Sequence, residues 1–273
     1  KAKELYRSIV AGASRSFAID SAEALMGDLA LTKVKASTED KSDITMEIHD
    51  IQTGIDSICG FSIKSELGTA PTLLNASNAT NFIYKIEGLS IVNMNEVNAI
   101  ETKTKLLDRI AKIREYGTLS YVGMENATFK DNLSLIDTSM DSIVAEIILE
   151  SYSTGETDCQ ALVSAVATRN TQNYNNPNRL YTYKMKKLLC STALGMMPSK
   201  EWNGHDEATG GYIVVTRSGN VVAYHIYNRD FFETYLLKHT KLERGSSTKH
   251  HYGLIYLVDG EMFIKLNLQI RFK

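Results

Sequence analysis

The chain has 273 residues, of which 43% are hydrophobic and 23% charged, and its formal net charge is −2. These values are typical of a globular protein with a sizeable core, and they exclude a uniformly basic protein that coats DNA. They leave room for a DNA enzyme that concentrates positive charge in a cleft.

Several features bear on where the protein works. The chain contains no apolar run long enough to span a membrane, and its N-terminal residues lack the apolar core of a signal peptide. The three cysteines lie far apart, and none has the spacing of a zinc site. We therefore expect a cytoplasmic protein with reduced thiols and no membrane partner.

Helical and strand patterns alternate along the chain. The first part is expected to form helices within 3–35, a polar loop over 36–42 and a β-hairpin near 43–66. A short helix capped by Thr72 and running through Ser77 should follow, and then a strand over Phe82–Ile86. Beyond them we expect one amphipathic helix over 92–116 and helices over Met140–Ser151 and Cys159–Thr168.

The last third of the chain changes to strand periodicity. We expect a hairpin of Tyr212–Thr216 and Val221–Tyr227 about a Ser218–Asn220 turn, a helix over Phe231–His239 capped by Asn228 or Asp230, and a hairpin of Leu254–Val258 and Met262–Ile270 about Asp259–Gly260. No linker or repeat divides the chain, so the sequence predicts a single α/β (α+β mixed) domain over 1–273, with its catalytic hairpin near 43–66 and a β-rich part near 211–273.

The hairpin near 43–66 carries the chemistry. Alternating apolar residues define one face of its first strand. With a turn centred near Thr53–Gly54, Ser62 and Lys64 lie alongside Thr45 and Asp43. The opposite, polar face then holds an acid and a lysine on paired strands, in a set made of Asp43, Thr45, Glu47, Ser62 and Lys64.

This polar face has two interpretations. In the functional one, Asp43 and the carbonyl of Ile63 bind Mg²⁺, because hard cations prefer oxygen ligands, while Lys64 orients the attacking water and stabilises charge on the phosphate. In the other, the face is solvated and Asp43 forms an exposed ion pair with Lys64 that contributes under about 1 kcal/mol.

At these residues the chain resembles the PD-(D/E)xK nucleases. Ser42–Asp43 stands in place of Pro-Asp, and Ser62–Ile63–Lys64 in place of (D/E)xK. The longer strings Gly60–Gly68, Pro71–Ser77 and Phe263–Phe272 are similar to the HpaII-type restriction endonucleases. The resemblance implies a nuclease-like core with a mixed β-sheet flanked by helices, and Mg²⁺-dependent cleavage of double-stranded DNA at a short C/G palindrome such as CCGG. It also implies a cognate methyltransferase in the same system, without direct contact.

Ser62 departs from this pattern, because a serine carries no negative charge to a metal. Another acid is then needed to complete the site. The candidates are Glu66, Glu47 and Glu23.

Basic segments outside the hairpin are candidates for DNA contacts. The stretch Gln160–Lys200 contains no acid, the loop Arg244–His251 combines glycine, hydroxyls and bases, and the last strand alternates polar with apolar residues. Ordinary surface roles are the alternative for all three segments. The candidate residues are Arg179, Lys184, Lys186, Lys187, Arg244, Ser246, Ser247, Lys249, Gln269 and Arg271.

Three hypotheses follow from these residues. The first is a type II restriction endonuclease, for which a palindromic target favours a homodimer. The second is a repair or recombination nuclease that recognises DNA structure, and the third is an inactive DNA-binding module in which Ser62 marks a lost metal site. Digestion of plasmid DNA with Mg²⁺ distinguishes them.

Overall fold

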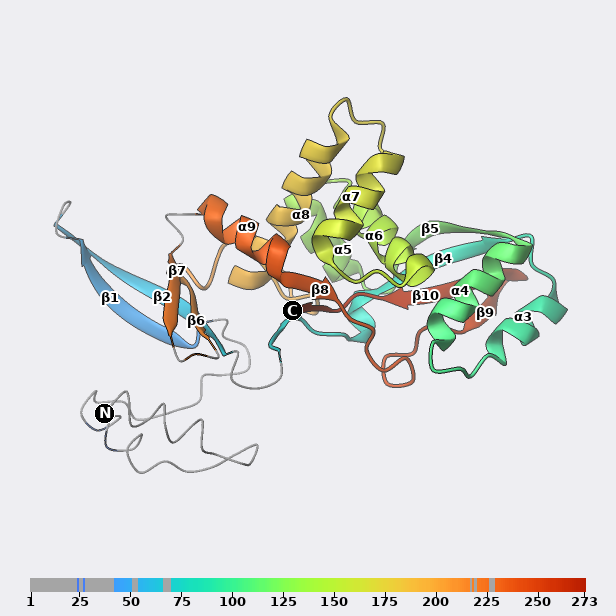
Figure 1. The fold of residues 1–273 in the computed structure, drawn as a ribbon, viewed down its shortest axis with the longest axis horizontal. Helices are drawn as coiled ribbons and strands as arrows, with labels where there is room; N and C mark the ends of the chain where they lie inside the picture. The colour runs from blue at the N-terminus through green and yellow to red at the C-terminus, as the bar shows by residue number, and fades with distance from the viewer. Residues whose placement is uncertain are drawn as a thin grey trace. The chain divides into compact units, whose positions relative to one another are not determined.

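A computed structural model describes residues 42–50, 54–65, 70–216, 218, 220–225 and 229–273, together with Ala24 and Gly27. The helices expected within 3–35 lie outside these residues. The chain divides into two compact units, the first made of Lys1–Pro71 and Glu207–Asn228 and the second of Thr72–Asp206 and Arg229–Lys273 (Figure 1). That the chain functions as the single domain expected from its sequence stays a prediction.

The first unit is built on a four-stranded mixed sheet. Its strand order is β1-β2-β6-β7, in which β2 pairs antiparallel with β1 and parallel with β6, and β6 pairs antiparallel with β7. The sheet confirms both hairpins expected in this unit. The strand bounds are β1 (Ile44–Asp50), β2 (Ile55–Ser65), β6 (Gly211–Val215) and β7 (Val221–His225).

The register of the β1–β2 hairpin differs from the expected one. Asp50 pairs with Ile55 and Ile44 with Phe61, so the connection is centred one residue earlier than Thr53–Gly54. Each partner therefore shifts by two residues, and Ser62 comes beside Asp43 instead of Thr45. Because side chains alternate with period two, this slip keeps the same residues on the same face.

The second unit contains two further sheets, both antiparallel. One has the order β5-β4-β10-β9 and the other β3-β11-β8. The strand expected at Phe82–Ile86 and the hairpin about Asp259–Gly260 are confirmed. The bounds are β3 (Thr72–Leu74), β4 (Asn81–Glu87), β5 (Thr118–Met124), β8 (Thr240–Leu242), β9 (Ile255–Val258), β10 (Glu261–Asn267) and β11 (Ile270–Phe272).

Two expectations that concern the sheets of this unit are wrong. The helix expected at Thr72–Ser77 is strand β3, followed by the short 3-10 helix η1 (Asn78–Thr80), because Thr72 pairs with Arg271 from the far end of the chain. The strand expected over Met262–Ile270 ends at Asn267, and Ile270 belongs to β11 in the other sheet. Both errors arise from pairing between distant segments, which local sequence patterns do not contain.

Seven α-helices occur among the described residues. The helices expected at Met140–Ser151, Cys159–Thr168 and Phe231–His239 are confirmed, although Asp230 lies inside the last one and is no cap, and Asn228 lies outside the described residues. None of the described helices is long and apolar enough to cross a membrane. The bounds are α3 (Ile91–Asn98), α4 (Lys105–Tyr116), α5 (Ala127–Ile136), α6 (Met140–Thr154), α7 (Cys159–Arg169), α8 (Pro177–Leu194) and α9 (Arg229–His239).

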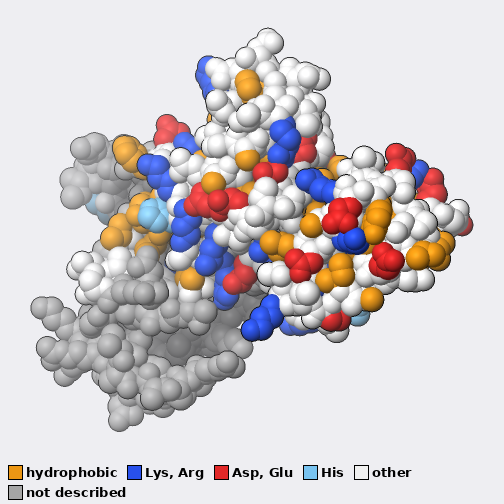
Figure 2. Space-filling view, turned by 45° about the vertical axis from the view of Figure 1, so that its right-hand side comes forward, with side chains coloured by type: hydrophobic (Ala, Val, Ile, Leu, Met, Phe, Trp, Pro, Cys, Tyr) orange, Lys and Arg blue, Asp and Glu red, His pale blue; other side chains and the backbone are white. Residues whose placement is uncertain are grey.

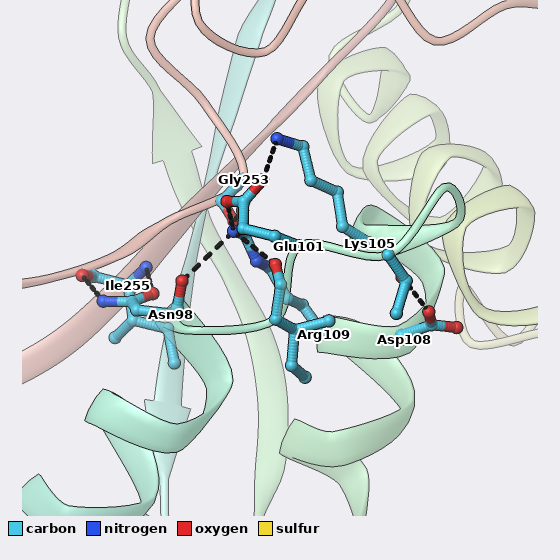
Figure 3. A network of polar contacts seen from close by, with 9 residues as sticks. Asn98, Glu101, Lys105, Asp108, Arg109, Gly253 and Ile255 are labelled. Carbon is cyan, nitrogen blue, oxygen red and sulfur yellow. Dashed lines mark hydrogen bonds and ion pairs between the residues drawn. The ribbon is translucent and has the colours of Figure 1, made fainter.

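The single helix expected over 92–116 is in fact two, α3 and α4, because other groups satisfy the backbone at the break. The buried guanidinium of Arg109 donates to the carbonyls of Asn98 and Ile100 at 3.2 and 2.8 Å, and to that of Gly253 at 2.9 Å. The Asn98 amide pairs with both backbone groups of Ile255 (Figure 3). These bonds replace those that a continuous helix would make.

Candidate active site

Asp43 is held at the start of the catalytic hairpin by three hydrogen bonds to β2. Its N–H donates to the carbonyl of Phe61 at 2.8 Å, which extends the β1–β2 ladder by one residue. Its carboxylate Oδ2 accepts from the N–H of Ile63 at 2.6 Å and from the hydroxyl of Ser62 at 3.1 Å. The structure thus brings Asp43, Ser62 and Ile63 together, as the motif predicts.

The carbonyl of Ile63 lies at the same edge of the sheet. The N–H and C=O of one strand residue point to the same side of the strand. The Ile63 N–H is directed at Asp43, so the Ile63 carbonyl also points to the β1 side of β2. It lies beyond the end of β1 and takes no part in the pairing of β2 with β6. This oxygen and the Asp43 carboxylate are hard ligands at one edge, which fits the donor set of a magnesium ion.

Lys64 occupies a partly buried position on the same strand. Its ammonium lies over the ring of Tyr212, 5.4 Å from the ring centroid. Burial lowers the pKa of Lys64, and the nearby charge of Asp43 opposes this shift only in part. The structure describes both Lys64 and Asp43, and their side chains form no direct ion pair. The interpretation as an exposed ion pair therefore does not describe this site.

Tyr212 is a site residue that the sequence analysis missed. It is 2% exposed and stands opposite Ser62 in the parallel β2–β6 pairing. A ring face attracts an ammonium group electrostatically, so Tyr212 fixes the position of Lys64. No local pattern pointed to it, because β2 and β6 are far apart along the chain.

A second missed feature is the support behind Ser42 and Asp43. The Ser42 hydroxyl donates to the carbonyl of Glu207 at 3.0 Å, and the carbonyl of Gly60 accepts from Gly210 at 2.7 Å. A side chain at Gly60 would overlap the Ser42 hydroxyl. A glycine inside a strand often marks such a close approach, and that was the available signal.

Asp43 is the acid that the hairpin places at this edge. The described residues hold no group of three His, Cys, Asp or Glu side chains that could together bind a metal ion. Of the three candidates for a second acid, Glu23 and Glu66 lie outside the described residues. Glu47 is exposed on β1, four residues from Asp43, which places it about 13 Å along the strand. That separation is too great for Glu47 to share a metal with Asp43.

The comparison with protein families matches HpaII restriction endonuclease over residues 1–272. The chain belongs to the HpaII restriction endonuclease family. It is 42% identical over 266 residues to the type II restriction enzyme HpaII of Haemophilus parainfluenzae, which covers 96% of this chain and 73% of that enzyme. No solved structure matches the chain.

Family membership confirms the resemblance seen in the sequence and makes the chain a site-specific endonuclease. It also confirms the fold class, since the mixed α/β architecture is consistent with a restriction endonuclease. The assignment of individual catalytic residues rests on the geometry around Asp43.

The lysines predicted to contact DNA from α8 have partners within the second unit. Lys184 contacts Asp137, Lys186 donates to the Thr234 hydroxyl at 2.8 Å, and Lys187 pairs with Glu233 at 2.7 Å. Figure 2 likewise shows basic side chains beside acidic ones on the face in view. These pairs favour a structural role for the lysines, whereas Arg179 is exposed.

The predicted contacts near the C-terminus divide in the same way. Arg271 forms a two-pronged pair with Glu243 at 3.2 and 2.9 Å, and Arg244 donates to the carbonyl of Ser151 at 2.8 Å. Gln269 is partly buried, with its Oε1 atom enclosed. In contrast, Ser246 and Lys249 are exposed, and Ser247 is half-buried, in the loop before β9.

Proposed function

We propose that this restriction endonuclease makes Mg²⁺-dependent double-strand cuts at a short palindromic C/G-rich site similar to CCGG. The observation that supports it most is the contact of Asp43 with both Ser62 and Ile63, beside Lys64 on the same strand. The chemistry needs a carboxylate, a carbonyl oxygen and a cation at one sheet edge, and β2 supplies two of these.

The residues of the hairpin have distinct roles in this proposal. Asp43 and the Ile63 carbonyl bind the metal, and Ser62 holds the carboxylate in place. A bound Mg²⁺ lowers the pKa of water and neutralises charge on a phosphate. Lys64 orients the attacking water and stabilises the developing negative charge as a fixed cation, with Tyr212 keeping it in position. Lys64 is half-buried, and the partial exclusion of bulk water strengthens its electrostatic interactions.

The proposed DNA target also implies an oligomeric state and partners. A palindromic duplex favours a two-fold dimer, because protein symmetry mirrors site symmetry. Restriction of foreign DNA requires a cytoplasmic enzyme and a cognate methyltransferase that protects the host site without contacting this chain. Phosphate contacts are assigned to exposed Lys249 and Ser246 and to half-buried Ser247, in preference to the paired lysines of α8.

The test of this function is digestion of plasmid DNA with Mg²⁺, followed by run-off sequencing of the ends. Discrete fragments with one end sequence are expected, and they give both the site and the stagger. A smear or cutting confined to branched DNA would instead identify a structure-selective nuclease. Retained DNA binding without cleavage would identify an inactive binding module.

The metal requirement provides one prediction. Cleavage is expected with Mg²⁺ or Mn²⁺ and to disappear in EDTA, whereas Ca²⁺ is expected to support binding without cutting. Calcium takes the same oxygen ligands but at longer distances and in looser geometry. Gel-shift and cleavage assays on one labelled duplex measure both properties, and full activity in EDTA would overturn the mechanism.

The acid that compensates for Ser62 provides another prediction. Glu66→Gln or Glu23→Gln is expected to lose cleavage, because a second carboxylate would supply the negative charge that Ser62 cannot carry to the metal. Glu47→Gln serves as a matched control on the same hairpin and is expected to cut normally. Circular dichroism checks folding, and normal cleavage by both test variants would show that the acid comes from another part of the chain.

A further inference from the structure

The loop between α7 and α8 projects from the second unit (Figure 1). It lies in the acid-free stretch of the sequence, and its residues 170–176 include four asparagines. Asn170 and Asn173 both have left-handed backbone conformations, with φ of 49° and 54°. Asparagine tolerates this conformation better than most residues, so the composition suits the path of the loop.

Alternate side chains anchor this loop to the unit. The Asn170 side chain bonds both the N–H and the carbonyl of Tyr174 at 2.9 Å. Gln172 donates to Ser142 and Glu146 of α6 at 3.2 and 3.1 Å. Tyr174 contacts the Ser139 hydroxyl at 3.0 Å, and its ring packs edge-on against Tyr181.

Four polar side chains beside these anchors are exposed. Asn173 and Asn175 lie in the loop, and Asn178 and Arg179 lie in the first turn of α8. Within the part of the chain that the structure describes, their side chains make no hydrogen bond or ion pair. The loop and the first turn of α8 therefore present amides and one guanidinium on an anchored backbone, with no acid among them.

We propose that these exposed side chains read base edges in a groove of the DNA. This inference rests on the proposed function and extends it, because it identifies residues that would determine sequence specificity. A guanidinium donates in a bidentate manner to guanine O6 and N7. Arg179 therefore matches the guanines of a C/G site. The amides of Asn173 and Asn175 each supply one donor group and one acceptor for the neighbouring base edges, and adenine is the base that asparagine pairs with in a bidentate manner.

The anchored backbone of this loop favours specific contacts with bases over nonspecific contacts with phosphates. Neutral amides release no counterions, so they add little to the salt-dependent part of DNA binding. Reading bases requires side chains placed in advance, and a loop that is already ordered costs less entropy to bind. The bonds of Asn170, Gln172 and Tyr174 provide that order in the free protein.

The test compares the full chain with an Asn175→Ala/Arg179→Ala double variant. Binding is measured by fluorescence anisotropy to the duplex that the wild type cuts and to a scrambled duplex, over a range of salt concentrations. We expect affinity for the cut duplex to fall by roughly tenfold or more. Affinity for the scrambled duplex should change less than about twofold, and the salt slope should stay the same.

Two matched variants control for the loss of similar side chains elsewhere in the unit. Gln160→Ala removes an exposed amide at the far end of α7, and Arg114→Ala removes an exposed arginine from α4. Both should bind like the wild type. Equal losses on both duplexes with a flatter salt slope, or no loss at all, would overturn base reading by this loop. Wild-type protein that does not distinguish the duplexes would instead overturn the proposed function.

Discussion

Replacing Lys64 with methionine is expected to reduce DNA cleavage by at least about a hundredfold, because it removes a fixed cation from the reacting phosphate. Single-turnover cleavage of a labelled duplex measures this loss. Lys103→Met, which changes an exposed lysine in the loop before α4, is the matched control and should cut normally. Near-normal cleavage by the Lys64 variant would remove this residue from the catalytic site.

The same variant is expected to unfold at a higher temperature at neutral pH. Burial lowers the pKa of Lys64, so the charged form is less favourable in the folded protein than in the unfolded chain. The destabilisation is present below the folded pKa, and stability recovers as pH rises from there toward the usual lysine value. Methionine abolishes this pH dependence, which thermal melts at several alkaline pH values would reveal.

Lys64→Met is expected to lower cleavage and to raise the melting temperature. These opposite changes distinguish a catalytic role of Lys64 from a role in stability. A residue retained only for stability would lower the melting temperature when replaced. The contact with the Tyr212 ring offsets part of the cost of burial, but a ring contact does not restore full hydration of an ammonium. Lost cleavage with an unchanged or raised melting temperature therefore identifies a charge kept for function.

Local sequence patterns predicted the catalytic hairpin well. The alternation in β1 and β2 specifies both strands and which residues share a face, so Asp43 and Ser62 were placed on the same face despite a two-residue slip in register. Side-chain period two tolerates such a slip. Long helices with continuous amphipathic patterns, such as α6 and α7, were also predictable because their pattern is local.

The features that sequence alone did not provide depend on distant pairing. Strand β6 joins β2 in parallel and brings Tyr212 beneath Lys64, and nothing near Lys64 in the sequence indicates this. Similarly, α3 ends where the Arg109 guanidinium donates hydrogen bonds to backbone carbonyls that a continuous helix would have used. The acid partners of Lys184 and Lys187 come from the residue after α5 and from α9, which is why a basic stretch resembled a free DNA surface.

Replacing Asp43 with asparagine is expected to reduce cleavage by at least about a thousandfold while leaving DNA binding intact. The metal's contribution is worth several kcal/mol, and it depends on a charged ligand. Asparagine keeps the shape of the side chain, and its amide oxygen still accepts from the Ile63 N–H that Asp43 binds at 2.6 Å. The hairpin should therefore fold normally, so the lost activity reports on charge.

Binding provides the sharper half of this prediction. A carboxylate beside a phosphate repels it, so the Asp43 variant should bind its site as tightly as the wild type or more tightly. Asp56→Asn is the control, because Asp56 lies on the same hairpin, exposed and paired with His49 at 2.7 Å. It should cut normally. If Asp43→Asn lost binding together with cleavage, Asp43 would act in assembling the DNA site, and the assignment of the metal to this edge of the sheet would fail.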